Sequence, residues 1–408
     1  MTTLADAEAL DAADPLRGLR ERFQLPESLI YLDGNSLGAL PKAAIARQQQ
    51  VVREEWGNSL IRSWNDHHWI EAPQRLGAKI APLIGAKPHE VIVADSVSVN
   101  LFKLITAAAA LAPERPVLLS EAGNFHTDLH VASGAAEAVP NLRLEVAARD
   151  RVEAAIGADT NLLLLTHVHY KSGERFDMAA VTARAKAHGA TTLWDLSHSV
   201  GAVPLHLNRD GAELAVGCGY KYLNGGPGAP AFLYVAEHLQ ERLVPVVRGW
   251  MGHAAPFAFT DDYVPAPGIG RFLVGTPPIL SLLALESGVE SFDGVDIDAL
   301  WAKSIALFDL FAALAEQRCP GLECISPRDP ERRGSHISFR HPHAFELVQA
   351  LVAAGVIGDF RAPDIARFGL TPLYLGYAEI WHAVDCLAQI LATGSWRDPA
   401  FAVRSKVT

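Results

Sequence analysis

The segment Cys218-Gly-Tyr-Lys-Tyr-Leu-Asn-Gly-Gly-Pro-Gly228 places a lysine between a short apolar run and a glycine-rich turn. The apolar run at 214–219 predicts a strand that ends just before Lys221. Strand ends are where α/β proteins bind ligands, and desolvation of a lysine there lowers its pKa and frees its amine for Schiff-base chemistry. Taken alone, the Gly-Tyr-Lys sequence is a weak signal, because a surface lysine beside a turn is more common.

Short apolar runs alternate with helical stretches on both sides of this segment, which predicts an α/β fold with a mainly parallel sheet. Strands are predicted at 116–120, 162–167, 191–196, 214–219 and 231–235. Helices are predicted at 42–56, 73–84, 100–111, 178–188, 281–291 and 300–316. After about residue 293, a strand at 336–340 and helices at 344–354 and 377–392 predict a smaller α+β domain.

A second signal is Leu193-Trp-Asp-Leu-Ser-His198, in which Asp195 ends another predicted strand, 26 residues before Lys221. A pyridoxal-phosphate cofactor needs a carboxylate at its pyridine nitrogen, because the protonated ring is the better electron sink. The alternative for Asp195 is an ordinary helix N-cap. The two interpretations are about even for Asp195 alone, and its pairing with Lys221 favours the cofactor.

Two further segments suit the same kind of ligand. Ser96-Val-Ser-Val-Asn100 opens an apolar helix, where backbone N–H groups and hydroxyls can bind a phosphate. Asn124-Phe-His-Thr-Asp128 follows a predicted strand, and its Phe125 could stack on a flat ring. Each segment has an ordinary alternative, a plain helix cap and a core phenylalanine, that would be preferred if the segment stood alone.

The composition limits the class of protein. The 408 residues carry a formal net charge of -11, from 35 basic and 46 acidic side chains, which argues against a nucleic-acid or anionic-membrane partner. The four cysteines form no CxxC pair, and no spacing such as HExxH indicates a metal site. The first residues have no apolar signal core, and the longest apolar stretch, near 104–113, is too short to span a bilayer. We therefore predict a cytoplasmic protein that holds no metal.

Asp195-x-x-His198 followed by Tyr220-Lys-Tyr-Leu-Asn224 resembles the cofactor-binding core of kynureninases, members of the aminotransferase class V group of fold-type I enzymes. The resemblance covers nearly the whole chain, and further segments that carry it are Tyr31-Leu-Asp-Gly-Asn-Ser-Leu-Gly38, Phe125-His-Thr-Asp128, Arg248-Gly-Trp-Met-Gly-His253, Phe272-Leu-Val-Gly-Thr-Pro-Pro-Ile-Leu280 and Arg367-Phe-Gly-Leu-Thr-Pro-Leu-Tyr374. It implies the pyridoxal-phosphate transferase fold of type I. We expect an N-terminal segment at 1–45 that joins the small domain, a large cofactor domain at 46–293 with a mainly parallel seven-stranded-type sheet flanked by helices, and a small α+β domain at 294–408.

The resemblance implies roles for residues near the predicted strand ends. Lys221 would hold the cofactor as a Schiff base, and Asp195 would pair with its pyridine nitrogen. Phe125 would stack on the ring, and His198 would lie close by, near the phosphate side. Tyr220 is the candidate for proton transfer, and a role in phosphate binding alone is equally open. The other expected cofactor contacts are Val97, Ser98, Asp128 and Thr166, with Trp250 and Thr276 reaching the phosphate from the second subunit of a homodimer.

The resemblance also implies a substrate site. Arg367 would bind the substrate α-carboxylate with Asn35 nearby, although a surface salt bridge is the ordinary alternative for an arginine. Trp64 would contact the aromatic end of the substrate. The chain departs from the family at His126, where proline is frequent, and at Thr276, where some members carry asparagine. The latter position and Trp64 look like the bacterial form, which favours kynurenine over its 3-hydroxy derivative.

The implied activity is hydrolytic cleavage of the Cβ–Cγ bond of L-kynurenine, and more weakly of 3-hydroxykynurenine, to anthranilate and L-alanine in tryptophan degradation. One alternative is another class V enzyme, such as a small-molecule aminotransferase. A cysteine desulfurase or selenocysteine lyase would need a nucleophilic cysteine, and the comparable stretch Gly355-Val-Ile-Gly-Asp-Phe-Arg-Ala-Pro-Asp364 contains none. An inactive binding protein of this fold is disfavoured, because such proteins commonly lose the lysine or the aspartate, and Lys221 and Asp195 are both present.

Overall fold

The large domain of the computed structural model, which describes residues 2–404, is built on a seven-stranded sheet. The strand order is β4-β10-β9-β8-β7-β5-β6. The strands are β4 (Val91–Val93), β5 (Val117–Glu121), β6 (Arg143–Ala147), β7 (Thr160–Thr166), β8 (Thr191–Asp195), β9 (Leu214–Cys218) and β10 (Ala231–Val235). All pairs from β6 to β9 are parallel, and β10 runs antiparallel to both of its neighbours. The sheet is therefore mainly parallel, as the sequence predicts.

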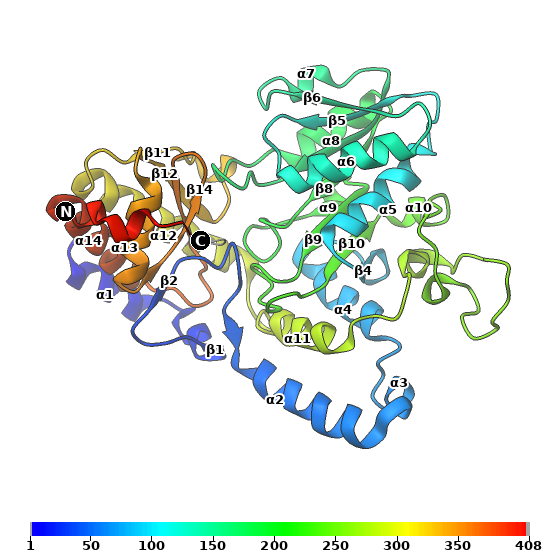
Figure 1. Ribbon diagram of the computed structural model, residues 1–408, viewed down its shortest axis with the longest axis horizontal. Coiled ribbons are helices and arrows are strands. Elements are labelled where there is room, and N and C mark those ends of the chain that lie inside the picture. Colours follow the sequence, from blue (N-terminus) through cyan, green and yellow to red (C-terminus); the bar gives the residue numbers. More distant parts are fainter. Residues whose placement is uncertain (1, 405–408) are drawn as a thin grey trace.

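Helices cover both faces of this sheet (Figure 1). The helices are α4 (Ala72–Ile80), α5 (Val97–Ala109), α6 (His126–Ala138), α7 (Val152–Ala155), α8 (Met178–Ala187), α9 (Leu207–Asp210), α10 (Glu237–Gln240) and α11 (Ile279–Glu290). Strand β7 reads Leu-Leu-Leu-Leu because it is buried on both sides: Leu162 and Leu164 pack in the cluster that includes α5 and α6, and Leu163 and Leu165 pack in the cluster that includes α4 and α8. Successive side chains of β7 therefore pack against opposite faces of the sheet.

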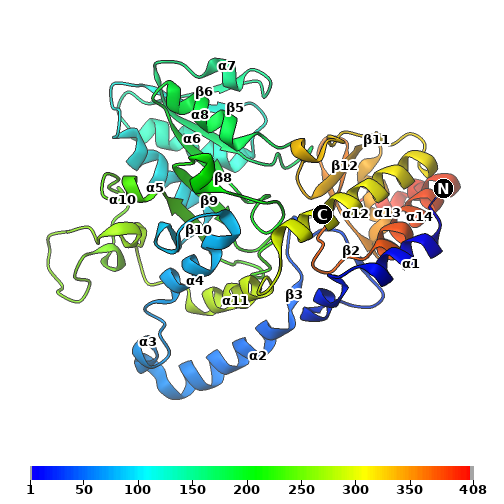
Figure 2. The same ribbon diagram turned by 180° about the vertical axis from the view of Figure 1, so that it is seen from behind.

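The smaller domain combines a four-stranded antiparallel sheet with three helices (Figure 2). The strands, in sheet order, are β11 (Glu323–Cys324), β12 (His336–Arg340), β15 (Ile365–Gly369) and β14 (Asp359–Arg361). The helices are α12 (Ile297–Arg318), α13 (Ala344–Ala353) and α14 (Tyr377–Thr393). The N-terminal segment packs here: α1 (Leu4–Ala13) contacts α14, and β2 (Ile30–Tyr31) pairs in parallel with β13 (Val356–Ile357). In the same N-terminal segment, β1 (Phe23–Gln24) and β3 (Leu40–Pro41) form a two-stranded antiparallel sheet, and α2 begins directly after β3.

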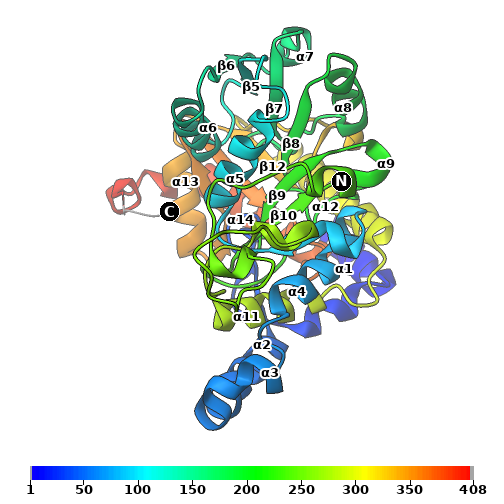
Figure 3. The same ribbon diagram turned by 90° about the vertical axis from the view of Figure 1, so that its right-hand side faces the viewer.

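An extended arm projects from the body of the molecule (Figure 3). It begins with α2 (Lys42–Gln50), continues as a π-helix over Val51–Ser59 and ends with α3 (Ser63–Asp66). Large apolar side chains on the arm stay exposed, among them Trp56 and Ile61.

The predicted elements are all present, with ends shifted by a few residues. The helix predicted at 100–111 begins earlier, at Val97, because the Ser96 hydroxyl accepts a hydrogen bond from the Val99 N–H group and caps it. The strands that were not predicted are β1–β4, β6, β11 and β13–β15, and the α-helices that were not predicted are α1, α3, α6, α7, α9 and α10. Within residues 2–404, no helix combines the length and apolar character needed to cross a membrane.

Candidate functional site

The carboxyl ends of β7, β8 and β9 surround a cavity of about 260 Å³ in the large domain. Lys221 follows β9 and lines this cavity, with its Nζ atom 3.0 Å from Nε2 of His198. The same Nζ atom lies 5.7 Å from the centre of the Phe125 ring and 5.9 Å from that of Tyr220. The lysine amine is therefore placed between an imidazole and two aromatic faces, at a strand end as predicted.

Two carboxyl groups lie next to one another in the cavity. Asp195 ends β8, and its Oδ1 atom accepts a hydrogen bond of 2.7 Å from the Ser197 N–H group. Asp128 is fully buried on α6, and Thr166 Oγ1 donates to its Oδ2 atom over 3.2 Å. Burial, and then the neighbouring Asp195 carboxylate, hold the pKa of Asp128 well above its usual value. The buried environment of Asp128 therefore favours the protonated form of its carboxyl group.

The first turn of α5 forms another wall of the cavity, through Ser96, Val97 and Ser98. The first N–H groups of a helix lack acceptors within the helix, and its macrodipole places partial positive charge there. This wall is suited to an anion.

His198 is buried, and burial together with the Lys221 charge lowers its pKa well below the usual value. Its ring lies 5.5 Å, centre to centre, from that of His336 on β12, so the small domain reaches the cavity here. His336 is also buried, and neither of its ring nitrogens has a partner among the described residues. Burial, followed by the Arg367 charge, keeps the pKa of His336 well below the usual range. Both imidazoles are uncharged at neutral pH.

Nine of the predicted cofactor residues line this one cavity: Val97, Ser98, Phe125, Asp128, Thr166, Asp195, His198, Tyr220 and Lys221. Trp250 and Thr276 are exposed, and Trp250 stacks edge-on with Phe257 at 5.7 Å. Trp64 packs on the arm against Trp69 at 6.0 Å, away from the cavity lining. A single chain thus brings together the first nine residues and leaves these three apart.

Arg367 lies on β15 and is only 1% exposed, so the alternative of a surface salt bridge is wrong. Its Nε atom donates to Asp359 Oδ1 over 2.8 Å, and the two groups form an ion pair whose side chains are both buried. Burial opposes the Arg367 charge, but Asp359 raises its pKa overall. Asn35 belongs to the N-terminal segment and is fully buried beside Gly369, which lies on the same strand as Arg367. The side-chain amide atoms of Asn35 have no hydrogen-bond partner among residues 2–404.

Residues that the sequence reasoning missed surround Arg367. Asp359 and Arg361 lie in the stretch 355–364, whose sequence indicates only that a nucleophilic cysteine is lacking. Ser36 lies in the N-terminal segment and donates to Asp359 Oδ2 over 2.6 Å. Tyr170 accepts a hydrogen bond from Arg367 at its backbone oxygen and packs edge-on against Phe125 at 5.3 Å. The only sequence signal for these residues was the pair of opposite charges at Asp359 and Arg361, two positions apart on one strand.

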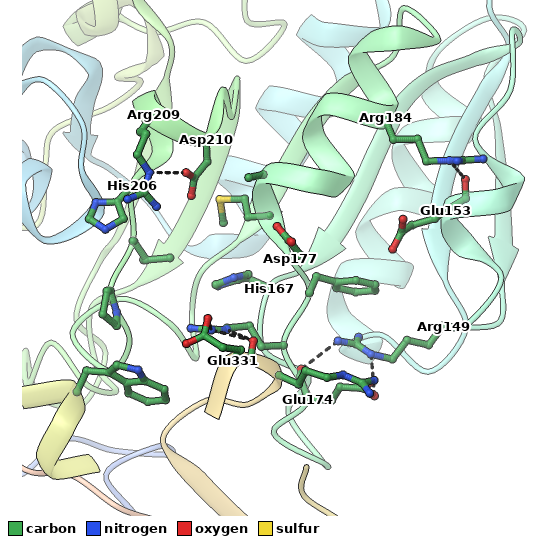
Figure 4. A pocket seen from close by; sticks show the side chains of 18 of the residues that line it. Arg149, Glu153, His167, Glu174, Asp177, Arg184, His206, Arg209, Asp210 and Glu331 are labelled. Atoms are coloured by element: carbon green, nitrogen blue, oxygen red, sulfur yellow. Dashed lines mark hydrogen bonds and ion pairs between the residues drawn. The ribbon is translucent and has the colours of Figure 1, made fainter. Parts of the chain in front are cut away.

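A second hollow, of about 1200 Å³, lies between the two domains and is larger (Figure 4). Each of its arginines is paired with an acidic side chain or a backbone oxygen, for example Arg149 with Glu174 at 3.0 Å and Arg175 with the backbone oxygen of Glu331 at 2.8 Å. His167 lines it, while Thr166, one position earlier on the chain, lines the smaller cavity. The cationic groups of the larger hollow are thus already paired within the protein.

Comparison with known proteins relates the whole chain to kynureninases. The family model described as "Kynureninase C-terminal domain" matches residues 300–387. The chain is 49% identical to a kynureninase of Pseudomonas fluorescens and 50% identical to one of Burkholderia mallei, each over the full length of both chains. Among solved structures, a mutant of C-DES with glycine covalently linked to its pyridoxal-phosphate cofactor superposes with a TM-score of 0.80 at 16% identity, covering 90% of this chain and 98% of that one.

Proposed function

Since the chain belongs to the kynureninase family, we propose how its own residues carry out the family's reaction. The protein is a pyridoxal-phosphate-dependent hydrolase that cleaves the Cβ–Cγ bond of L-kynurenine to give anthranilate and L-alanine. The observation that carries the assignment of the site is the Lys221 amine, enclosed beside Asp195, His198 and Phe125.

The residues of the cavity fit the cofactor. A flat pyridine ring that bears an aldehyde and a phosphate needs an amine, a carboxylate, an aromatic face and an anion site. Lys221, Asp195 and Phe125 provide the first three, and the first turn of α5 provides the fourth. Nδ1 of His198 and Oδ1 of Asp128 are buried without a partner in the described part of the chain, and an enclosed polar ligand would satisfy such atoms.

The bound cofactor supplies an electron sink for negative charge that develops on the carbon atoms of the amino acid. Lys221 would hold the cofactor through its amine, and this amine, when free, would take the α-proton of the substrate. The Asp195 carboxylate would stabilise positive charge on the ring nitrogen of the cofactor. His198, uncharged and 3.0 Å from the lysine amine, accepts a hydrogen bond that orients that amine.

The hydrolytic step needs a proton donor near the γ-carbonyl. Water adds to this carbonyl, the Cβ–Cγ bond breaks, and the carbon left behind takes up a proton. Burial, and then the neighbouring Cys218, raise the pKa of the Tyr220 phenol, so its hydroxyl is a donor at neutral pH. We assign proton donation to Tyr220, with phosphate binding as the alternative. A Tyr220→Phe variant with lowered kcat and unchanged cofactor affinity supports donation, whereas loss of cofactor affinity supports the alternative.

The active form is proposed to be a homodimer. Trp250 and Thr276 are exposed in the single chain, which suits residues that complete a site in a second copy. Exposed apolar side chains lie nearby in sequence and on the arm, with Phe259 at 83% and Ile61 at 78% of full exposure. Apolar patches of this kind mark protein contacts. Light scattering on the holoenzyme should give twice the chain mass, and a monomer that remains active would contradict the proposal.

We further propose a cytoplasmic enzyme of tryptophan degradation that prefers kynurenine over 3-hydroxykynurenine. This preference rests on the identities of Trp64 and Thr276. The ratio of kcat/KM for the two substrates measures it directly, and a ratio that favours the hydroxylated substrate would contradict it.

The decisive assay measures anthranilate release, by its fluorescence, from purified holoenzyme given L-kynurenine. Parallel samples receive L-cysteine, with sulfide as the readout, and L-kynurenine with a 2-oxo acid, with the new amino acid as the readout. We expect anthranilate and L-alanine in equal amounts. Sulfide release or amino transfer without anthranilate would replace the proposed reaction by that of a desulfurase or an aminotransferase.

A further inference from the structure

The sheet of the small domain presents a polar face toward the site. On β14 and β15, Phe360 and Phe368 pack in the core, whereas Asp359 and Arg367 lie directly opposite one another in the strand register. Side chains alternate between the faces of a strand, so Arg361 shares the face of Asp359. Two arginines and an aspartate on one largely buried face are costly unless they are paired or bind a ligand.

These residues form a compact group, which we call the arginine cluster: Asp33, Ser36, Asp359, Arg361 and Arg367. Asp359 Oδ2 accepts hydrogen bonds from Arg361 over 2.6 Å and from the Ser36 hydroxyl over 2.6 Å. The Ser36 oxygen in turn accepts from Arg361 over 3.1 Å and from Arg367 over 3.0 Å. One carboxylate and one hydroxyl thus hold both guanidinium groups side by side.

The cluster has an excess of one positive charge at neutral pH. Although burial opposes ionisation, Arg367 holds the pKa of Asp359 well below its usual value, so this carboxylate is charged. Burial, and then the charge of Asp359, raise the pKa of Asp33 to about 8, so Asp33 is neutral. Two guanidinium groups and one carboxylate leave a charge that one further carboxylate would balance.

The unused hydrogen-bond donors belong mainly to Arg361. A guanidinium group has five N–H donors. Arg361 uses both N–H groups of one terminal nitrogen on Asp359 and Ser36 and one of the other on the Phe360 oxygen, and its Nε–H group has no acceptor among residues 2–404. Arg367 uses its Nε–H, one full terminal nitrogen and one further N–H group. The Arg361 side chain is also 29% exposed, against 1% for Arg367.

The cluster lies within electrostatic range of the reacting groups. The charges of both Arg367 and Arg361 lower the pKa of His198, which lies 3.0 Å from the Lys221 amine. Arg367 also donates to the backbone oxygen of Tyr170, whose ring packs edge-on at 5.3 Å against Phe125 in the cavity lining. A carboxylate that binds the free donors of Arg361 and Arg367 would therefore belong to a ligand whose other end reaches Lys221.

We propose that Arg361 is a second substrate-binding guanidinium, which receives the α-carboxylate together with Arg367 while Asp359 fixes the position of both arginines. This inference rests on the proposed role of Arg367 as a carboxylate-binding residue. In this proposal the α-carboxylate of the substrate, and not its aromatic end, neutralises the excess positive charge of the arginine cluster.

The test compares L-kynurenine with the corresponding amine that lacks the carboxylate, on holoenzyme variants. Binding is measured by titration of the cofactor absorbance, so the amine need not be turned over. Arg361→Gln should weaken L-kynurenine binding and raise its KM by about 10- to 100-fold, the range for charge-assisted hydrogen bonds. The amine should bind the variant and the parent enzyme equally, and kcat should change much less than KM. Arg340→Gln, an exposed arginine of β12 paired with Glu323, is the matched control and should change neither ligand.

Arg361→Lys keeps the positive charge but lacks the planar set of guanidinium donors, so it should weaken L-kynurenine binding less than Arg361→Gln does. It replaces the glutamine variant in the test if that variant does not fold. A KM within twofold of the parent, or equal weakening of both ligands, would overturn the role of Arg361. If Arg367→Gln loses selectivity for the carboxylate while Arg361→Gln keeps it, the inference fails and the proposed role of Arg367 stands. If both variants keep it, both assignments fail.

Discussion

The two hollows of this molecule lie on opposite sides of one strand end and differ in what their polar groups contact. Thr166 lines the smaller cavity and His167 lines the larger hollow, although they are neighbours in sequence. In the larger hollow, arginines such as Arg149 and Arg175 are paired with acidic residues or backbone oxygens. In the smaller cavity, the lysine amine faces an uncharged histidine, and buried polar atoms of His198 and Asp128 have no partner in the part of the chain that is described.

This difference shows that the volume of a cavity alone does not identify a functional site. Paired charges around the larger hollow satisfy one another, so they contribute to holding the two domains together and have little left for a ligand. Buried groups that lack partners cost free energy, and they persist where a ligand satisfies them. The following predictions test this distinction, beginning with the substitution of largest expected effect.

Replacement of the cavity lysine should abolish turnover. In Lys221→Ala no amine remains to hold the cofactor or to move the α-proton, so anthranilate release should fall below detection. Lys186→Ala, an exposed lysine of α8, is the matched control and should keep full activity. The circular dichroism and the melting temperature of both variants report whether the fold is intact. Substantial release from a folded Lys221→Ala enzyme would show that the chemistry lies elsewhere.

The two neighbouring carboxyl groups should respond differently to the same substitution. Asp195→Asn removes a charge at the cofactor, and we expect kcat to fall about 100- to 1000-fold, typical of a lost electrostatic contact to a developing charge. Burial favours the protonated form of Asp128, and asparagine mimics that form, so Asp128→Asn should lower kcat by less than about 10-fold. Steady-state kinetics at saturating cofactor measure both. Equal losses would mean that the two carboxyls are not distinguished by their protonation.

The smaller cavity could largely be predicted from sequence because its residues follow local signals. Asp195 is the last residue of β8, Lys221 lies three residues after the end of β9, and Ser96 caps the helix that follows it. Parallel strands bring their carboxyl ends to one edge, so residues at successive strand ends had to meet. The short edge strand β6 escaped prediction because its residues Arg143–Ala147 are mostly exposed and carry no buried apolar run.

The assembly of the arginine cluster around Arg367 could not be predicted from the alternating charges of Asp359 and Arg361, because contacts between distant segments create it. Ser36 and Asp359 are 323 positions apart, and they meet only when the N-terminal segment packs against the small domain. Asp359 faces Arg367 only in the observed antiparallel register of β14 and β15; a shift by one residue would turn Asp359 to the opposite face. Neither the register nor the packing has a local sequence signature in a three-residue strand.

Protonation of Asp33 should make the stability of the arginine cluster depend on pH. Burial and Asp359 raise the pKa of Asp33 to about 8, so the folded protein holds a proton that the unfolded chain releases near its ordinary pKa of about 4. The stability that this carboxyl contributes is therefore complete below about pH 4 and is lost as the pH rises through 8. Asp33→Asn mimics the protonated form at every pH, so its melting temperature relative to the parent should rise between pH 5 and pH 9.

The matched control is Asp66→Asn, an exposed residue of α3 whose side chain is 49% accessible. Its melting temperature should follow that of the parent across the same range of pH. Parallel curves for Asp33→Asn and the parent would mean that Asp33 does not hold its proton in the folded protein, and the charge count of the arginine cluster would then be zero.

The smallest effect is expected in the larger hollow. Arg332 lines it and pairs with Glu174 over 3.0 Å, but its side chain is 65% exposed, and exposed ion pairs contribute about 0–1 kcal/mol. Arg332→Gln should therefore leave kcat and KM within about twofold and lower the melting temperature by a few degrees at most. Steady-state kinetics and thermal unfolding measure the two quantities on the same sample. The larger hollow is distinguished from the site by its paired charges. If Arg332→Gln melts normally but changes KM well beyond twofold, the larger hollow binds the substrate or controls access to the smaller cavity.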